Sequence, residues 1–322
     1  MGNASLSALC ANNLILTLPR IYQPNLLICT MLKILLPVDF SEGTLKACHY
    51  AFQLCATPVG SQLLLIHCFQ DYLADADTDT APPLTQTPSA AITENVIYRN
   101  ETDAFEQLEA LYKHLQNALP ANSNIYLERK MIHGSPEDCI PEQVKEFQAD
   151  LLVMHTDGKS GLGRSVFGTV TTKMVEAVKI PVLTIPLHYK GTSINRVLYA
   201  TDFDEADSTA IQKLQQLLQP ANPAVSCVHI SDETQAKDQA QLEQLQQRLQ
   251  QAHGKPIQFV LLAGHDVAES LLQFVQDEQI DLVSLASREH STWDKLFNQS
   301  LAKKLVLESQ IPLLIFHGKR EG

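Results

Sequence analysis

Short runs rich in leucine, valine and isoleucine alternate along the chain with longer stretches in which apolar residues recur every three or four positions. The first pattern predicts buried strands and the second predicts amphipathic helices, and their alternation is typical of βαβ units with a parallel sheet. We expect strands at 32–38, 62–68, 124–132, 150–154, 181–185, 195–200, 224–230, 257–262, 280–285 and 312–316. We expect helices at 42–56, 95–118, 136–147, 168–178, 205–218, 233–252, 266–277 and 298–308.

This pattern of strands and helices occurs twice along the chain. Leu-Pro-Val-Asp-Phe at 36–40 matches Tyr-Ala-Thr-Asp-Phe at 199–203, an offset of 163 positions. Lys-Ile-Pro-Val-Leu at 179–183 matches Gln-Ile-Pro-Leu-Leu at 310–314, an offset of 131 positions. Matches at constant offsets indicate two copies of one folding unit.

The repeat predicts the domain organisation. The first copy is expected at 31–189 and the second at 194–322. The first copy is longer mostly because of one insertion from Asp71 to about Ala91. Met31 opens directly onto the first strand, so we interpret residues 1–30 as an N-terminal extension or a mis-called upstream start.

Composition narrows the function classes. The chain has 322 residues, of which 45% are hydrophobic and 19% charged, which is typical of two globular domains and excludes a disordered chain. Lys and Arg number 24 against 36 Asp and Glu, a net charge of −12, which argues against a nucleic-acid partner. The longest apolar runs fall far short of the roughly 20 residues that cross a bilayer, and no signal peptide is recognised, so no membrane association is expected.

The seven cysteines form no Cys-x-x-Cys pair and lie mostly in apolar surroundings. This pattern predicts buried, reduced thiols and a cytoplasmic protein.

A glycine-rich stretch follows the strand predicted at 150–154. It carries glycines at 158, 161, 163 and 168 and runs into a helix that opens with Gly168, Thr169 and Val170. The N–H groups at a helix start bind anions, glycines let the backbone approach a ligand closely, and Thr169 adds a hydroxyl donor. The stretch therefore predicts a phosphate site.

Other phosphate and metal motifs are excluded. Gly158-Lys159-Ser160 resembles the end of a P-loop, but its first glycine would fall at Val153, inside a strand. No Gly-x-Gly-x-x-Gly follows the first strand, which excludes a dinucleotide-binding Rossmann domain. The acidic run at 75–79 lacks the glycine and glutamate of a calcium loop, so no metal site is predicted.

Gly158 is followed by nine residues and then by Gly168 and Thr169, and Asp39 closes the first strand. With Ile-Pro repeated before the last strand of each copy, this spacing resembles the universal stress protein family, as a tandem two-domain member. The resemblance implies an α/β fold of two tandem doubly wound domains, each a five-stranded parallel sheet of order 3-2-1-4-5 flanked by helices. It also implies that the domains pair as a covalent pseudo-dimer, and a further homodimer of chains is compatible with it.

The resemblance further implies an adenine-nucleotide site in domain 1. Asp39 would accept a hydrogen bond from ribose or base. His155 departs from the family pattern, because it stands where the family has glycine; its side chain either fills the space of a close backbone approach or adds a polar group. The residues that would line the site are Pro37, Val38, Asp39, Cys68, Met154, His155, Gly158, Gly168, Thr169 and Val170.

Each candidate also has a purely structural interpretation. Asp39 either binds a ligand or caps the helix that begins near Ser41. The loop glycines either approach a phosphate or serve turn geometry alone. His155 is better read as a loop side chain than as a catalytic base, because no nucleophile lies near it in sequence. His67 and His229, repeated in mid-strand, are interpreted as buried histidines with satisfied hydrogen bonds.

The second copy has diverged at the loop. Glu289 stands in place of Gly158 and Gln299 in place of Gly168, and only Ser300 survives of the phosphate set, beside Asp202, the counterpart of Asp39. A carboxylate repels phosphate, and a side chain blocks the approach of the backbone. We therefore expect only domain 1 to bind nucleotide.

The function expected from these features is a cytosolic stress-response protein that binds or senses ATP or a related adenine nucleotide, with or without Mg²⁺. At most slow hydrolysis is expected and no catalytic residue is assigned, because the loop offers no carboxylate pair beyond Asp39 and Asp157. The alternative is a scaffold that binds another small ligand or a protein.

Overall fold

A computed structural model describes residues 31–55, 60–70, 89–119, 123–156, 169–191, 193–231, 235–249, 256–287 and 310–317. The predicted glycine loop, most of the predicted insertion and the helix expected at 298–308 lie outside these residues.

The helices and strands of each half lie close to the predicted ranges. The first half contains β1 (Leu32–Pro37), α1 (Glu42–Leu54), β2 (Ser61–Phe69), α2 (Ser89–Ala118), β3 (Ile125–His133), α3 (Pro136–Phe147), β4 (Leu151–Thr156), α4 (Thr169–Ala177) and β5 (Val182–Pro186). The second half contains β6 (Arg196–Ala200), α5 (Glu205–Leu217), β7 (Ala224–Ser231), α6 (Gln235–Leu249), β8 (Ile257–Ala263), α7 (Val267–Asp277), β9 (Leu282–Ser287) and β10 (Leu313–His317).

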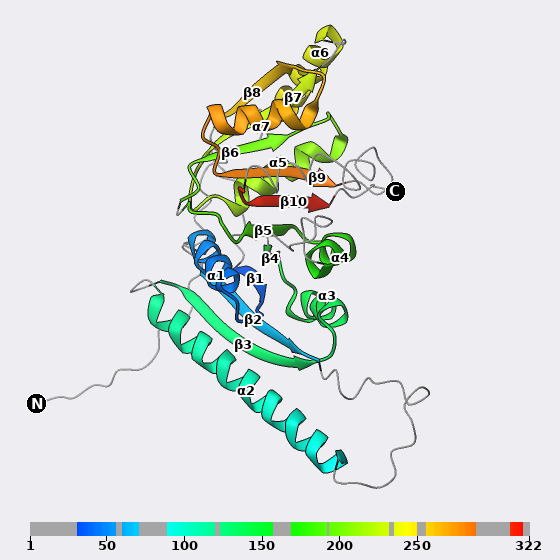
Figure 1. The fold of residues 1–322 in the computed structure, drawn as a ribbon. Helices are drawn as coiled ribbons and strands as arrows, with labels where there is room; N and C mark the ends of the chain where they lie inside the picture. Colours follow the sequence, from blue (N-terminus) through cyan, green and yellow to red (C-terminus); the bar gives the residue numbers. More distant parts are fainter. Residues whose placement is uncertain are drawn as a thin grey trace, which may run out of the picture. The chain divides into compact units, whose positions relative to one another are not determined.

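The described strands form one ten-stranded sheet in the order β3-β2-β1-β4-β5-β10-β9-β6-β7-β8 (Figure 1). Within each half the strands are parallel and follow the predicted order 3-2-1-4-5. The halves meet where β5 pairs antiparallel with β10, with Thr184 opposite Leu313. The buried Thr184 hydroxyl donates to the Leu313 carbonyl at 3.3 Å. The two domains therefore pair through their last strands.

The strand register confirms the two sequence offsets. In the first half Ile34 of β1 lies opposite Leu151 of β4, and in the second half Val197 of β6 lies opposite Leu282 of β9. Val197 follows Ile34 by 163 positions and Leu282 follows Leu151 by 131, the offsets of the sequence repeat. The two copies therefore correspond residue by residue around the ends of these strands.

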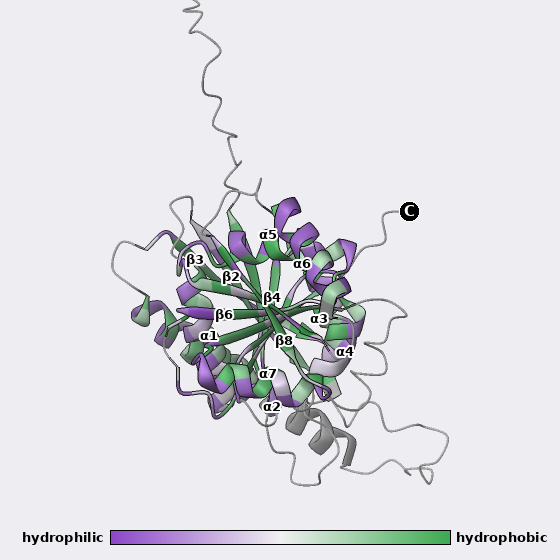
Figure 2. Ribbon diagram, turned by 90° about the horizontal axis from the view of Figure 1, so that it is seen from above, coloured by the Kyte–Doolittle hydropathy of each residue, from purple (hydrophilic) through white to green (hydrophobic). Residues whose placement is uncertain are grey.

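Both faces of the sheet are buried at its central strands, which explains the unbroken apolar runs of these strands. Along β1 the side chains of Ile34 and Leu36 belong to one hydrophobic cluster and Leu35 to the other. Helices α1, α2, α5 and α6 contribute to the first cluster, and α3, α4 and α7 to the second. Figure 2 shows the strands largely green and the hydrophilic residues gathered on the helices.

None of the described helices combines the length and the apolar character needed to cross a membrane.

Candidate functional site

The turn between β1 and α1 forms the first wall of the site. Val38 extends the strand, since its N–H donates to the Ile66 carbonyl of β2 at 2.8 Å. Phe40 then adopts a left-handed backbone conformation (φ 62°), which reverses the chain toward the helix. Ser41 is the N-cap of α1, and its hydroxyl accepts from the Thr44 N–H.

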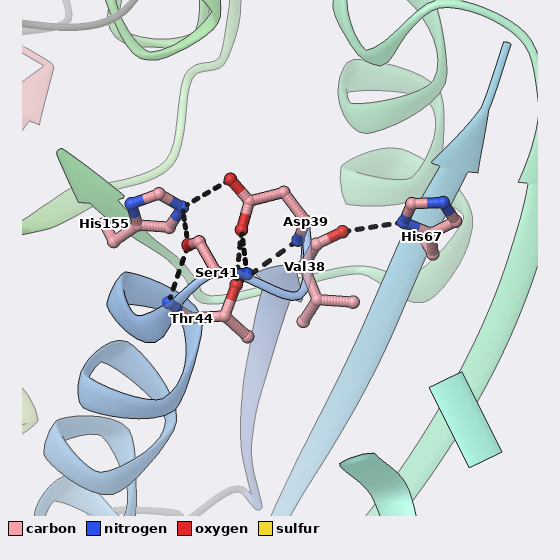
Figure 3. A network of polar contacts seen from close by, with 6 residues as sticks. All are labelled: Val38, Asp39, Ser41, Thr44, His67 and His155. Carbon is pink, nitrogen blue, oxygen red and sulfur yellow. Dashed lines mark hydrogen bonds and ion pairs between the residues drawn. The ribbon is translucent and has the colours of Figure 1, made fainter. Parts of the chain in front are cut away.

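The Asp39 carboxylate lies at the centre of a polar network (Figure 3). Its Oδ1 accepts hydrogen bonds from the Ser41 N–H at 3.0 Å and from the Thr44 hydroxyl at 2.8 Å. Its Oδ2 lies 2.9 Å from Nε2 of His155. The Asp39 side chain is nevertheless 55% exposed. Asp39 is not the helix cap, because Ser41 is the N-cap of α1, but its carboxylate holds Ser41 and Thr44 in place and still faces solvent.

The environment keeps Asp39 ionised. Burial alone would raise the pKa of this carboxyl, but the hydrogen bonds from His155 and Ser41 and the charge of His155 outweigh it. The pKa therefore lies well below its usual range. A carboxylate held in this form is a strong acceptor for ligand hydroxyl or amino hydrogens.

The side chain of His155, near the end of β4, points toward the turn between β1 and α1. Its side chain is 12% exposed, and Nε2 also lies 3.2 Å from the Ser41 hydroxyl. The ring packs against Gly43 so closely that a Cβ at position 43 would lie 2.5 Å from Nδ1. His155 therefore adds a polar group to the site and directs it at Asp39.

The structure brings most of the other predicted residues to the same edge of the sheet. Pro37 ends β1, and Val38 is buried directly after it. Met154 belongs to the hydrophobic cluster against which Cys68 of β2 and Val170 of α4 also pack. Val38, in contrast, belongs to the hydrophobic cluster on the other face of the sheet.

The structure describes only the C-terminal end of the predicted phosphate site. Thr169 is the first residue of α4, as predicted for the helix that follows the loop. Gly158 and Gly168 lie outside the described residues. Among the described residues, no three His, Cys, Asp or Glu side chains are grouped to hold a metal ion.

The repeated histidines stabilise the turn. Nδ1 of His67 donates to the Val38 carbonyl at 2.9 Å, and the ring stacks on Phe40 with centroids 4.4 Å apart. In the second copy His229 donates to the Thr201 carbonyl at 2.8 Å and stacks on Phe203 at 4.1 Å. Each histidine thus has a backbone hydrogen bond, as expected, but both side chains are partly exposed rather than fully buried.

The equivalent place in domain 2 is built differently. Asp207 of α5 is 2% exposed and accepts from the Tyr199 hydroxyl at 2.7 Å, the Thr201 hydroxyl at 2.5 Å and the Asp204 N–H at 3.0 Å. Burial raises the pKa of Asp207 in spite of these hydrogen bonds. Ala286, the counterpart of His155, is buried and offers no polar group.

Sequence reasoning missed Gly43 and Thr44, which complete the Asp39 network. Thr44 carried a weak signal, because it is the third residue of a helix that follows a capping serine. Gly43 carried a stronger one, since a glycine inside the first turn of a helix lowers its stability and calls for a packing reason.

The fold defines a tandem α/β protein of two doubly wound domains, and comparison with known proteins gives the family. A model described as the Universal stress protein family matches residues 31–186 and 193–317. The chain belongs to this family. A universal stress protein of Methanocaldococcus jannaschii is 29% identical over 153 residues, which are 48% of this chain and 81% of that protein.

Solved structures agree on the fold. A universal stress protein from Archaeoglobus fulgidus matches with a TM-score of 0.64 at 15% identity, covering 88% of this chain and 98% of its own. A putative universal stress protein from Pseudomonas aeruginosa matches with a TM-score of 0.55 at 12% identity, covering 90% of this chain and 95% of its own. Both matches span the two tandem domains.

Proposed function

We propose that this protein is a cytoplasmic stress-response protein whose first domain binds ATP or a related adenine nucleotide as a sensor. The second domain serves as a pseudo-dimer partner that binds no nucleotide. Any hydrolysis is slow, since the site contributes one ligand-facing carboxylate and no assigned base.

The observation that carries this proposal is the ionised, half-exposed Asp39 at the carboxyl end of β1. In doubly wound sheets, ligands bind outside the strand ends where the chain order switches, here between β1 and β4. Asp39 offers a hydrogen-bond acceptor there, and Cys68 and Met154 offer apolar contact for a base. The start of α4 at Thr169 supplies backbone donors for a phosphate.

The limit of one site per chain is supported by the second domain. Its buried carboxylate, Asp207, is turned into the core and satisfied there by three donors. Glu289 and Gln299 replace the two loop glycines of the first copy. We propose that this domain contributes through the β5–β10 contact instead.

A second candidate function is a scaffold for another small ligand or for a protein. The hydrogen bond between His155 and Asp39 favours this second function, because His155 competes with a nucleotide hydroxyl for the same carboxylate. The experiment below separates the two.

Denaturing the purified protein and analysing the supernatant by mass spectrometry tests the proposal. We expect about one adenine nucleotide per chain, and saturating ATP should raise the melting temperature by roughly 5 °C or more. An empty supernatant together with an unchanged melting temperature refutes nucleotide binding. Two nucleotides per chain refute the assignment to domain 1 alone.

A matched pair of variants places the site. Gly168→Asp puts a carboxylate against the phosphates and should abolish binding, whereas Gln299→Asp, at the equivalent position of domain 2, should leave it unchanged. A homodimer also belongs to this proposal, and sedimentation at twice the 35.7 kDa of the chain would support it.

A further inference from the structure

The hydrogen bonds of Asp39 are distributed unequally over its two oxygens. Oδ1 accepts from the Ser41 N–H and from the Thr44 hydroxyl, which together use both of its lone pairs. Oδ2 accepts from Nε2 of His155. Within the part of the chain that the structure describes, one lone pair of Oδ2 is therefore left for a ligand, and the carboxylate as a whole is half exposed.

His155 is fixed on its other side by α1. A Cβ built at Gly43 would lie 2.5 Å from Nδ1, 2.7 Å from Cγ and 3.1 Å from Cβ of His155. Because this contact reaches the root of the side chain, rotation of the ring alone does not relieve it. Gly43 thus provides the space that the ring needs. Figure 3 shows the ring of His155 beside Asp39.

The second copy of the fold is an internal comparison. At the repeat offsets, Ala206 is the counterpart of Gly43 and Ala286 that of His155. Where the strand residue is alanine, the helix residue carries a Cβ; where the strand residue is histidine, the helix residue is glycine. The two positions differ together between the copies. This indicates that glycine occupies position 43 because His155 needs the space, and not because the helix requires a glycine there.

We propose that His155 is a positioning residue for the ligand site of domain 1. It holds Asp39 so that Oδ2 accepts a hydrogen bond from a single hydroxyl of the bound sugar. This inference rests on the nucleotide site proposed above and deepens it. A carboxyl group attached by a single bond to Cβ rotates in a broad, roughly two-fold well. The His155 contact acts together with the two hydrogen bonds to Oδ1 to restrict that rotation, and it sets the direction of the outward lone pair of Oδ2.

The specificity that follows is testable with deoxynucleotides. Since one lone pair is free, one of the two ribose hydroxyls is bonded to Asp39 and the other is not. Of 2′-deoxy-ATP and 3′-deoxy-ATP, one should bind as tightly as ATP, and the other should bind about tenfold or more weakly, as for loss of a hydrogen bond to a charged group. Equal binding of ATP and both analogues overturns the inference, and so does an equal loss for both.

Variants at His155 test its role directly. His155→Ala should raise the Asp39 carboxyl pKa, measured by ¹³C NMR without ligand, and should erase the difference between the two deoxynucleotides. His155→Gln retains an N–H donor on a neutral side chain and should restore part of that difference. An unchanged Asp39 pKa in His155→Ala overturns the positioning role.

The Gly43 variants separate positioning from general damage. Gly43→Ala should displace the ring and raise the Asp39 pKa although His155 is still present. The double variant Gly43→Ala/His155→Ala reproduces the pair of domain 2, so it should regain stability but not the low Asp39 pKa. Ala206→Gly is the control in domain 2 and should leave Asp39 unchanged. A Gly43→Ala variant with a normal Asp39 titration contradicts the inference.

These measurements also distinguish the two proposals. If the wild-type protein binds no nucleotide while His155→Ala raises the Asp39 pKa, the proposed function fails and the positioning of Asp39 stands. If nucleotide binds and neither His155→Ala nor Gly43→Ala alters the Asp39 pKa or the deoxynucleotide preference, the function stands and the positioning role fails.

Discussion

Thr44 and Asp207 are equivalent residues, each the third residue of the first helix in its domain. Their side chains have opposite roles: Thr44 donates a hydrogen bond to the segment after the preceding strand, and Asp207 accepts one from it. In domain 1 the Thr44 hydroxyl donates to the Asp39 carboxylate. In domain 2 the Thr201 hydroxyl at the strand end donates to the Asp207 carboxylate on the helix. Domain 2 therefore carries an additional, buried carboxylate on its first helix, while Asp202, the counterpart of Asp39, remains partly buried after the strand.

The buried Asp207 should make folding stability depend on pH in a definite direction. Burial raises its pKa in the folded state above the unfolded value of about 3.9. Its contribution to the free energy of unfolding is therefore fully present below that pH and is lost as the pH rises through the folded pKa. We expect the free energy of unfolding, measured with urea, to fall less between pH 4 and pH 7 for Asp207→Asn than for the wild type. A parallel decline in the two proteins would contradict this.

Asp39 should behave in the opposite way. Its folded pKa lies below the unfolded value of about 3.9, because the hydrogen bonds from His155 and Ser41 outweigh its burial. Its stabilising contribution is therefore complete above that pH and is lost as the pH falls through the folded pKa. The stability difference between wild type and Asp39→Asn should be largest at pH 5 to 7 and should shrink on acidification to pH 2. A difference that grows in acid would contradict this assignment.

The contact between β5 and β10 should make the two domains unfold together. Leu314 of β10 lies opposite Leu183 of β5, and both are buried in a hydrophobic cluster to which each domain contributes. Leu314→Ala should cost about 2–5 kcal/mol, as cavity-forming substitutions do. Hydrogen exchange followed by mass spectrometry should show faster exchange in peptides of both domains.

Tyr126→Ser is the control for that experiment, since Tyr126 is 59% exposed on the edge strand β3. A change within about 0.5 kcal/mol is expected there. Faster exchange confined to domain 2 in Leu314→Ala would show that the halves unfold separately.

Much of the fold is predictable from local pattern. Ile34, Leu35 and Leu36 form an unbroken apolar run, and such a run is required where a strand is covered on both faces. The start of α2 was less predictable. It begins at Ser89, six residues before the predicted start, because the apolar stripe of Ala104, Leu108 and Leu115 marks only the part of a helix that packs in the core.

The site was predictable as far as it depends on strand ends. Asp39 and His155 follow apolar runs, and the ends of parallel neighbours meet at one edge of a sheet. The packing of His155 on Gly43 was not predictable, because it joins residues far apart in sequence and depends on the direction of a ring. Periodicity and spacing carry no information on that direction.

The cysteines offer a further test that also reports on the site. Burial raises the pKa of Cys48, Cys55 and Cys68 to about 12, and it raises the pKa of Cys139 and Cys227 as well. Alkylation requires the thiolate, so iodoacetamide at pH 7.5 should modify Cys48, Cys55 and Cys68 in the folded protein roughly a thousandfold more slowly than a free cysteine, and Cys139 and Cys227 should also react more slowly. All five should react after denaturation, as peptide mapping would show.

Cys68 is the most informative of the five, since it is only partly buried and is expected to lie beside the base of a bound nucleotide. Its alkylation at pH 9 should be slow and should become slower still with ATP, whereas Cys227 in domain 2 should show no effect of ATP. Labelling of Cys68 at the rate of a free cysteine would contradict its raised pKa. Protection of Cys68 and Cys227 to the same extent would indicate general stabilisation by ATP, because a ligand held at β1, β2 and β4 covers only the first of these thiols.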